Sequence, residues 1–593
     1  MPQLEIGNEG GSPMADSVVL TVRPCGTTDK EVTEGGRVRG TRIAAPRERT
    51  RRPLLPVAPA AATCLVALSV FSTQSFSQTA APTAPAASAA TPGGLHCTGA
   101  AVRKNVPVDK DPLNGQKDPF VGPLSGSDLP RDVLRSSVAN RDLIFSVGLP
   151  CQESVNTSGQ EVDEVLKQPI GLDNLQRGFD FYSWRTFIAL NAPADGTPIE
   201  QAQAGAPTLW EDMNSFKQLL DVMLPADQLP PKWPTDRAGM EAERERLVPQ
   251  ECSALHRQFP QRMIVKMIEE SFNEPFKTGP LIDQHGHYAI FDILMNRQMF
   301  NYIMANHLNT KAGQAANTTL SVDFPAGLNA KGELGAFMLK VSWRILSPGE
   351  VQAKNFHMVD ALVLTPPPAT QRCLKETLGL VGFHAVHKTV SRPQWIWTSF
   401  EHVQNVPARD EVTAHKLRGP YSFFSVNCKG DCAENATPPT PWDPDPALEL
   451  RFRSDDSFKS QIVRETPLTN AAKNMNAIFQ SMLSNSVWKN YMLISTQWPS
   501  AFSCTSQQAK SPGSPDPKTD FFKQPDMTCS PAPTFLANST LETYSQGDVP
   551  LASSSCIACH SNAVSFQESA SNPQPGRPNL NQSDFTYMLE KAK

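Results

Sequence analysis

The sequence predicts an α+β protein whose strands form a mostly antiparallel sheet. Four stretches between residues 337 and 402 are rich in the β-branched and aromatic residues that strands favour. The connections between these stretches are too short to hold the helical crossovers that parallel neighbours need. Two other stretches, 173–190 and 469–490, repeat apolar residues at the helical period instead. We therefore expect helices packed on an antiparallel sheet, in one large unit or two closely packed ones.

The individual elements follow from local patterns. In 173–190, Phe179, Trp184 and Phe187 recur at helical spacing, and Pro193 ends the helix. Weaker helical patterns cover 209–224, 236–248 and 297–308. The expected strands are 288–294, 337–346, 357–364, 378–389 and 394–402.

The N-terminal region contains the successive parts of a secretory signal: a basic stretch, an apolar run and a cleavage site with small residues. Residues 54–71 are the most apolar run of the chain, they follow a cluster of arginines, and small residues come next at Ser75 and Ser77. The run is too short and too rich in proline for a comfortable transmembrane helix. We therefore expect residues 1–77 to be a leader and signal peptide cleaved near Ser77, which places the mature chain in the periplasm or outside the cell.

Composition limits the partners of the mature chain. The whole chain of 593 residues has a formal net charge of −5, and residues 1–77 carry nine Lys and Arg against seven Asp and Glu. The mature chain is therefore acidic, which predicts no nucleic-acid partner. No second long apolar span follows, so we expect no membrane span in the mature chain. Residues 78–94 predict a disordered linker, 95–534 an α+β body, and 535–593 a C-terminal segment packed on that body.

Export also sets the chemistry of the cysteines. Eight cysteines of the mature chain lie outside the C-terminal motif described next, so up to four disulfides are expected in an oxidising compartment. Their pairing does not follow from the sequence, except that Cys428 and Cys432 flank a Gly-containing turn and could form a local bridge. A zinc site at that turn lacks two further ligands nearby.

A short motif near the C-terminus carries the strongest chemical signal. Cys556, Cys559 and His560 form C-x-x-C-H, the attachment pattern of a c-type haem. Two thiols at this spacing can each form a thioether with one porphyrin, and the adjacent imidazole can bind the iron. The alternative is a disulfide or redox pair of cysteines with an incidental histidine. A thioredoxin-like pair should follow a strand in a βαβ pattern, which is not seen around this motif.

The second axial ligand of such a haem has four candidates. Only 33 residues follow His560, so the body of the protein must complete the haem environment, and Met588 is the one sulfur downstream. Met588 could equally be a packing residue on a helix. The other candidates are His384, His387 and His402, each of which could also be structural.

The spacing of the histidines argues against a joint metal site. On a helix, His384 and His387 would share a face, but GLVGFHAVHKTV predicts a strand. We therefore expect the two side chains to point to opposite faces of the sheet, so that only one of them can face the haem.

Several segments together resemble a group of large exported bacterial proteins known as cytochrome c family proteins. The resemblance covers roughly residues 175–590 and implies one covalent haem attached at Cys556 and Cys559, iron ligation by His560, and a periplasmic location. It implies no established reaction. The segments that carry it are FDFYSWRTFIALNAP (179–193), GLVGFHAVHKTVSRPQWIWTSFEHVQNVP (379–407), VWKNYMLISTQWP (487–499), LANSTLETYSQ (536–546) and SSCIACHSNA (553–562).

These observations support two functions and leave open whether the chain is an enzyme. The first is a periplasmic c-type cytochrome that transfers electrons to or from a redox partner protein or a small-molecule acceptor. The second is a haem-dependent oxidoreductase of peroxidase or oxygenase type with an open distal iron position. The large size of the chain favours the enzyme, whereas the plain motif and the absence of an obvious distal catalytic pair favour the carrier. A third possibility is a binding protein in which the haem is structural or sensory.

Overall fold

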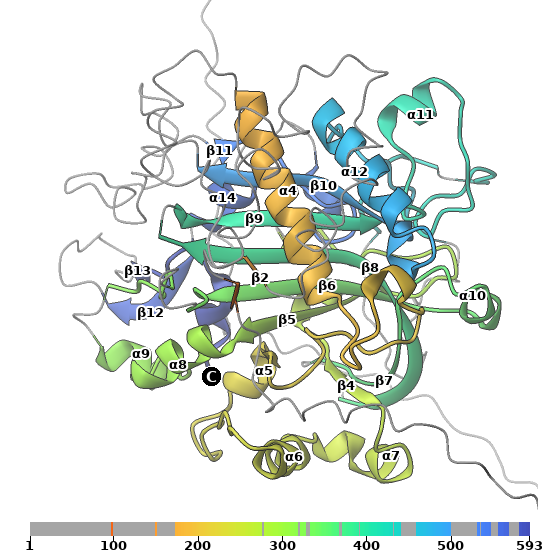
Figure 1. Ribbon diagram of the computed structural model, residues 1–593. Coiled ribbons are helices and arrows are strands. Elements are labelled where there is room, and N and C mark those ends of the chain that lie inside the picture. The colour runs from red at the N-terminus through yellow and green to blue at the C-terminus, as the bar shows by residue number, and fades with distance from the viewer. Residues whose placement is uncertain are drawn as a thin grey trace, which may run out of the picture. The chain divides into compact units, whose positions relative to one another are not determined.

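Figure 1 shows the computed structural model of the chain, and the described residues lie within one compact unit, Thr91–Lys593. The structure describes residues 97–98, 149–150, 172–275, 278–317, 321–327, 333–366, 371–390, 392–430, 432–439, 458–499, 531–533, 535–546, 555–561, 563–568 and 580–593. The expected signal peptide and linker lie outside the described residues, as does most of the region between 95 and 171.

Nine of the described strands form one large sheet. Its path runs β11–β10–β9–β8–β6–β5–β3, with β7 beside β8 and β4 beside β7. All neighbours are antiparallel except β4 and β7, which are parallel. The predicted mostly antiparallel sheet is therefore confirmed. The strands are β3 Phe216–Gln218, β4 Met263–Lys266, β5 Ile290–Asn296, β6 Phe337–Ile345, β7 Met358–Leu364, β8 Cys373–Thr389, β9 Arg392–His402, β10 Tyr491–Pro499 and β11 Pro531–Ala532.

The longest strand, β8, holds the sheet together because it has different neighbours along its length. Its first half pairs with β7, and its second half lies between β6 and β9. A disulfide joins Cys373, at the start of β8, to Cys252. The expected bridge between Cys428 and Cys432 is also present.

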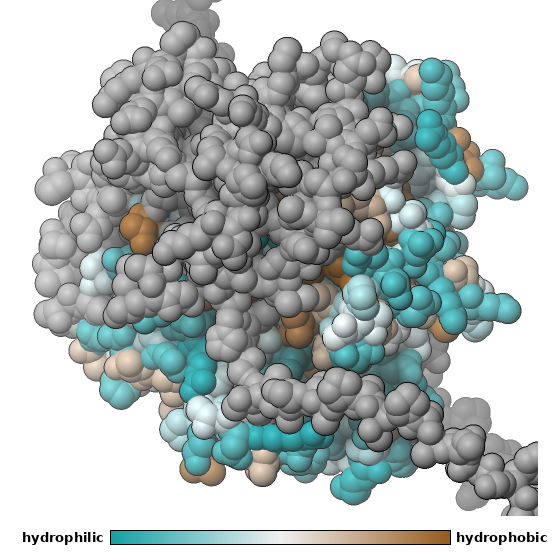
Figure 2. Space-filling model, viewed as in Figure 1, coloured by the Kyte–Doolittle hydropathy of each residue, from teal (hydrophilic) through white to brown (hydrophobic). Residues whose placement is uncertain are grey.

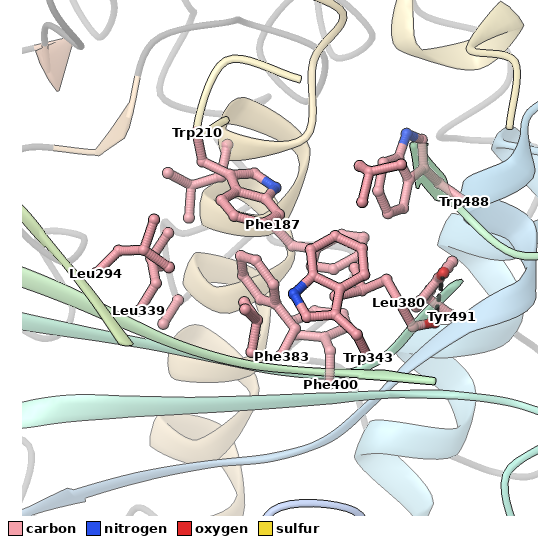
Figure 3. Packing of buried hydrophobic residues seen from close by; sticks show 14 of the residues in the cluster. Phe187, Trp210, Leu294, Leu339, Trp343, Leu380, Phe383, Phe400, Trp488 and Tyr491 are labelled. Atoms are coloured by element: carbon pink, nitrogen blue, oxygen red, sulfur yellow. Dashed lines mark hydrogen bonds between the residues drawn. The ribbon is translucent and has the colours of Figure 1, made fainter. Parts of the chain in front are cut away.

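Two helices cover one face of this sheet, as Figure 1 shows: α4 (Leu172–Leu190) and α12 (Asn470–Met482). Their aromatic residues form the centre of the main core between helices and sheet (Figure 3). Trp184 of α4 stacks on Phe479 of α12 with ring centroids 4.7 Å apart, and Phe187 stacks on Phe400 of β9 at 4.1 Å. The apolar period of residues 173–190 thus predicted both the helix and its buried face.

Two expected helices are shorter than their patterns. The helix expected over 469–490 ends at Met482, and after the 3₁₀ turn Val487–Asn490 the chain enters β10. The helix expected over 209–224 is a turn followed by β3 and the short α5 (Leu219–Val222). The Asp212 side chain accepts a hydrogen bond from the Asn214 backbone N–H at 2.9 Å, which favours a turn there.

The remaining described elements surround the sheet. The helices are α6 Arg237–Arg246, α7 Ser253–Gln258, α8 Arg297–Ala305, α9 Lys311–Ala316, α10 Pro348–Ala353, α11 Arg409–Thr413 and α14 Cys556–His560. Two small sheets pair β1 (Cys97–Thr98) with β2 (Leu149–Pro150) and β12 (Val564–Glu568) with β13 (Leu580–Gln582).

The surface is mainly hydrophilic where Figure 2 shows described residues. Among the described residues, the large apolar side chains that stay exposed are Leu229, Val390 and Val426, and isolated residues of this kind are ordinary. No helix in the described ranges is long and apolar enough to cross a membrane.

The C-terminal part of the chain packs on the sheet face opposite α4. Residues 536–546 bind the strands there through buried polar side chains: Asn538 donates to Ser399 Oγ at 3.1 Å, and Ser539 Oγ donates to Glu401 at 2.7 Å. The helix α14 lies beside β9 and β10. This face therefore brings the cysteine–histidine motif next to the central strands.

Candidate functional site

The motif helix α14 is held at both ends by residues distant in the sequence. At its start, Gln497 of β10 accepts hydrogen bonds from the Ile557 backbone N–H at 2.9 Å and from Ser555 Oγ at 3.2 Å. At its end, the Tyr587 hydroxyl donates to the Cys559 carbonyl at 2.9 Å. A helix of five residues is only marginally stable by itself, so these contacts stabilise it and fix its position.

His560 is oriented by one hydrogen bond and two aromatic rings. Its Nδ1 lies 2.9 Å from the carbonyl oxygen of Phe585. Because a carbonyl only accepts, this distance requires a proton on Nδ1 and leaves the lone pair on Nε2. The ring packs against Trp397 and Tyr587, with centroids 4.4 and 5.1 Å away. Burial lowers the pKa of His560 to about 4, although the Phe585 carbonyl opposes this shift, so the imidazole is neutral at pH 7.

The two cysteines of the motif carry thiols, in contrast to the disulfides found elsewhere in the chain. The sulfur of Cys556 lies 3.7 Å from the Leu536 carbonyl oxygen. Burial raises the pKa of the Cys556 thiol, and the nearby Glu542 carboxylate adds to this effect. A thiol of this kind is a poor redox nucleophile, because the reactive form is the thiolate.

The structure separates the four candidate axial ligands. As expected, His384 and His387 point to opposite faces of the sheet: His387 lies on the α4 side, where its Nδ1 is 2.5 Å from the Tyr182 hydroxyl. His402, at the end of β9, pairs with Tyr491 of the α4-side core and stacks on Phe356. Burial lowers the pKa of both His387 and His402 to about 3. Neither imidazole faces the motif.

His384 is the histidine on the same sheet face as the motif. Its Nε2 lies 2.9 and 3.1 Å from the two carboxylate oxygens of Glu542, and Lys340 Nζ lies 3.5 Å from the same carboxylate. Burial alone would raise the pKa of Glu542, but the charges of His384 and Lys340 and its hydrogen bonds together lower it to about 2. Glu542 is therefore an anion beside Cys556 and His560 at neutral pH.

Met588 lies in the 3₁₀ helix Tyr587–Lys591 and is 3 % exposed. It belongs to the same large buried cluster as Ile557, and the neighbouring Tyr587 contacts the end of the motif helix through its hydroxyl. Met588 and His384 are thus the two candidates that the structure brings near the motif.

Sequence reasoning missed several residues that build this site, among them Gln497, Glu542 and Phe585. Gln497 and Glu542 act through side chains that meet the motif only in the folded chain, and Phe585 contributes a backbone carbonyl that leaves no trace in the sequence. Glu542 lies in the segment 536–546 that carries part of the family resemblance, although its role could not be assigned from that segment.

Among the described residues, no group of three or more His, Cys, Asp and Glu side chains is arranged to hold a metal ion by itself. Comparison of the chain with protein-family models, curated proteins and solved structures found no match.

Proposed function

We propose that the chain is an exported c-type cytochrome that carries one covalent haem. Cys556 and Cys559 would supply the thioether bonds, and Nε2 of His560 would bind the iron. The observation that carries this proposal is the hydrogen bond between His560 Nδ1 and the Phe585 carbonyl. Metal-binding histidines typically use their second ring nitrogen in this way, which fixes the tautomer and orients the ring.

The residues around the motif fit this group. A neutral imidazole with its lone pair on Nε2 is the ligand form of histidine, and burial keeps His560 neutral at physiological pH. Trp397 and Tyr587 pack on the imidazole and limit its rotation. A redox-active cysteine pair would instead need a thiolate, which burial disfavours at Cys556.

A bound haem supplies one-electron transfer, and the protein residues set the conditions for it. His560 and the apolar cluster around Ile557 and Met588 hold the attachment site in a partly water-excluded environment. The Glu542 anion and the Lys340 cation lie on the same sheet face, where they would bias the potential of the iron in opposite directions. The acceptor or donor is a redox partner protein or a small molecule.

A second function is favoured by one observation, the hydrogen-bonded pair of His384 and Glu542. A carboxylate that orients an imidazole is a common acid–base arrangement. If the distal iron position is open, this pair can transfer protons there, and the chain is then a haem-dependent oxidoreductase. If Met588 or His384 itself binds the iron, the chain is an electron carrier.

The decisive experiment is to express the full chain in a bacterium that matures c-type cytochromes and to isolate the exported form. After denaturing electrophoresis, a haem stain should label the band, and the reduced spectrum should show a c-type α band. The double substitution Cys556→Ser with Cys559→Ser should abolish the stain, whereas Cys428→Ser with Cys432→Ser should keep it. An unstained wild-type band would refute the proposal.

Carbon monoxide separates the two functions once the haem is present. A reduced protein whose spectrum does not change with carbon monoxide has two protein ligands and is a carrier. A spectrum that shifts with carbon monoxide indicates an open iron site. In that case the peroxide turnover of the His384→Gln variant is measured, and a lower turnover than in wild type identifies His384 as the acid–base residue.

A further inference from the structure

The chain makes a tight turn between Ser583 and Thr586, and this turn contacts the motif histidine. The Thr586 backbone N–H donates to the Ser583 carbonyl at 3.2 Å, and the Ser583 hydroxyl donates to the Thr586 carbonyl at 2.5 Å. Both central residues have a left-handed backbone, with φ of 51° at Asp584 and 63° at Phe585. Such turns favour Asn and Gly, and a bulky residue such as Phe585 adopts a positive φ only where its surroundings impose it. We therefore looked for the contact that holds this turn.

The turn is anchored by a buried ion pair with the central strand β8. The Lys388 ammonium of β8 donates to Asp584 Oδ2 at 2.6 Å, and the Phe324 backbone N–H donates to the same oxygen at 2.7 Å. The side chains of Lys388 and Asp584 are 3 % and 0 % exposed. Separating a buried pair leaves an uncompensated charge in the interior, so this contact resists movement of the turn.

Asp584 is ionised at neutral pH, as the ion pair requires. Burial raises the pKa of Asp584 to about 6, although the charge of Lys388 and its hydrogen bond oppose this shift. The carboxyl group is therefore mostly deprotonated at pH 7 and pairs with the ammonium.

Lys388 has a second carboxylate partner, Asp323, which differs from Asp584 in its surroundings. The Asp323 side chain is 61 % exposed, and exposed ion pairs contribute little to stability. In the described part of the chain, its carboxylate forms no hydrogen bond with residues 583–586. Asp323 is therefore a matched comparison that shares the ammonium of Lys388 but does not hold the turn.

The turn presents the carbonyl that orients His560. The Phe585 carbonyl oxygen lies 2.9 Å from Nδ1 of His560. Because peptide units are planar, the direction of this carbonyl depends on the backbone angles of the turn. A continuous path of contacts thus joins β8 to the motif helix through Lys388, Asp584 and Phe585.

We propose that Lys388 and Asp584 are positioning residues for His560, because their ion pair holds the left-handed turn that aims the Phe585 carbonyl at Nδ1. The inference rests on the proposed function in so far as His560 is a ligand only with haem bound. In the haem-free chain, the ion pair should keep the proton on Nδ1 and the lone pair on Nε2. With haem bound, the same hydrogen bond makes the imidazole a stronger electron donor.

The test measures which ring nitrogen of His560 carries the proton. The full mature chain is prepared with Cys556→Ser and Cys559→Ser, so that no haem is attached, and with isotope-labelled histidine. Long-range proton–nitrogen NMR spectra at pH 7 distinguish the two tautomers, and His560→Gln assigns the signal. In this background, Asp584→Gly removes the carboxylate but tolerates the positive φ. We expect the ratio of the Nδ1–H form to the Nε2–H form to fall by about fivefold or more.

Two further variants separate positioning from general destabilisation. Asp323→Asn removes the exposed partner of Lys388 and should change the tautomer ratio by less than about twofold. If Asp584→Gly does not fold, Lys388→Met takes its place, with the same expected fall. A ratio that stays at the wild-type value when the ion pair is removed, or that falls equally in Asp323→Asn, would overturn the proposal.

The haem-loaded chain gives a second readout and separates this inference from the proposed function. The haem stain of the wild-type chain decides whether haem is attached, and the tautomer ratio decides whether the ion pair positions His560, so either can fail alone. Asp584→Gly and Asp584→Asn remove the same charge, but Asn keeps an oxygen for the Phe324 N–H and Lys388 and tolerates a left-handed backbone.

We expect a higher reduction potential in Asp584→Gly than in Asp584→Asn, because an imidazole without its carbonyl partner donates less electron density to the iron. Equal potentials in the two variants would mean that Asp584 acts by its charge alone, which would contradict the positioning role.

Discussion

At the scale of single residues, the charges beside the motif should control the reduction potential of the proposed haem. Glu542 is an anion and Lys340 a cation on the sheet face that holds Cys556 and His560. A negative charge would stabilise the oxidised iron of this haem, so Glu542→Gln should raise the potential and Lys340→Met should lower it, each by about tens of millivolts. The shifts are measured by spectroscopic redox titration. The exposed Glu241→Gln on α6 is the control and should leave the potential unchanged.

If both charge variants shift the potential in the same direction, the electrostatic explanation fails, and a change in iron ligation is the better one. The reduced spectrum of each variant distinguishes the two cases, because a lost ligand changes the spin state whereas a lost charge does not.

His387 should make the stability of the fold depend on pH. Burial lowers its pKa to about 3, against 6.5 in an unfolded chain. Below pH 6.5 the unfolded state therefore binds a proton that the folded state does not, and stability decreases as pH falls towards 3. In urea unfolding, the stability advantage of wild type over His387→Phe should shrink by up to about 1.4 kcal/mol per pH unit in that window. If the difference in unfolding free energy between wild type and His387→Phe stays constant between pH 7 and 4.5, His387 binds its proton as readily in the folded protein as in the unfolded chain.

At the scale of elements, the position of α14 depends on Gln497. Its side chain accepts from Ile557 and Ser555 and donates to the Pro533 carbonyl at 2.8 Å. Gln497→Ala should cost about 1–3 kcal/mol of unfolding free energy, because it leaves a buried helix start without an acceptor. The rate of backbone hydrogen exchange at α14 should also rise in this variant.

The matched control is Gln480→Ala on α12, which removes one hydrogen bond to the Tyr491 carbonyl at 2.9 Å. This variant should lose about 1 kcal/mol and leave exchange at α14 unchanged. Faster exchange at α14 in both variants would show that the motif helix responds to general destabilisation and not to its own cap.

Elements with long apolar patterns could be predicted from the sequence, and those that depend on distant partners could not. The strands β6 to β9 and the helix α4 carry enough apolar residues for their period to be visible. β3 has three residues and is defined by its pairing with β5, which a local pattern does not record. The motif itself was visible, but the residues that orient it, Gln497 and Phe585, were not, because their roles arise from tertiary contacts.

At the scale of the whole molecule, the C-terminal segment is part of the fold that it joins. Thr543 donates to the buried Glu274 through its backbone N–H and its hydroxyl, both at 2.8 Å, and Ser539 binds the buried Glu401. Ile557 and Met588 complete an apolar cluster with Trp395 and Trp397 of β9. A haem attached to α14 would therefore be coupled to the sheet and not carried on a separate module.

A truncation tests this coupling directly. A chain that ends at residue 534 leaves Glu274 and Glu401 without these donors, and each such loss costs on the order of 1–3 kcal/mol. With the exposed apolar cluster added, the total approaches the 5–15 kcal/mol that holds a typical domain together. We therefore expect the truncated chain to lose cooperative thermal unfolding and to bind a hydrophobic dye, whereas the chain that starts at residue 78 keeps a sharp transition. A truncated chain that unfolds as cooperatively as the full one would show that the C-terminal segment is an appended module, and the potential of the proposed haem would then be independent of Lys340 in the body.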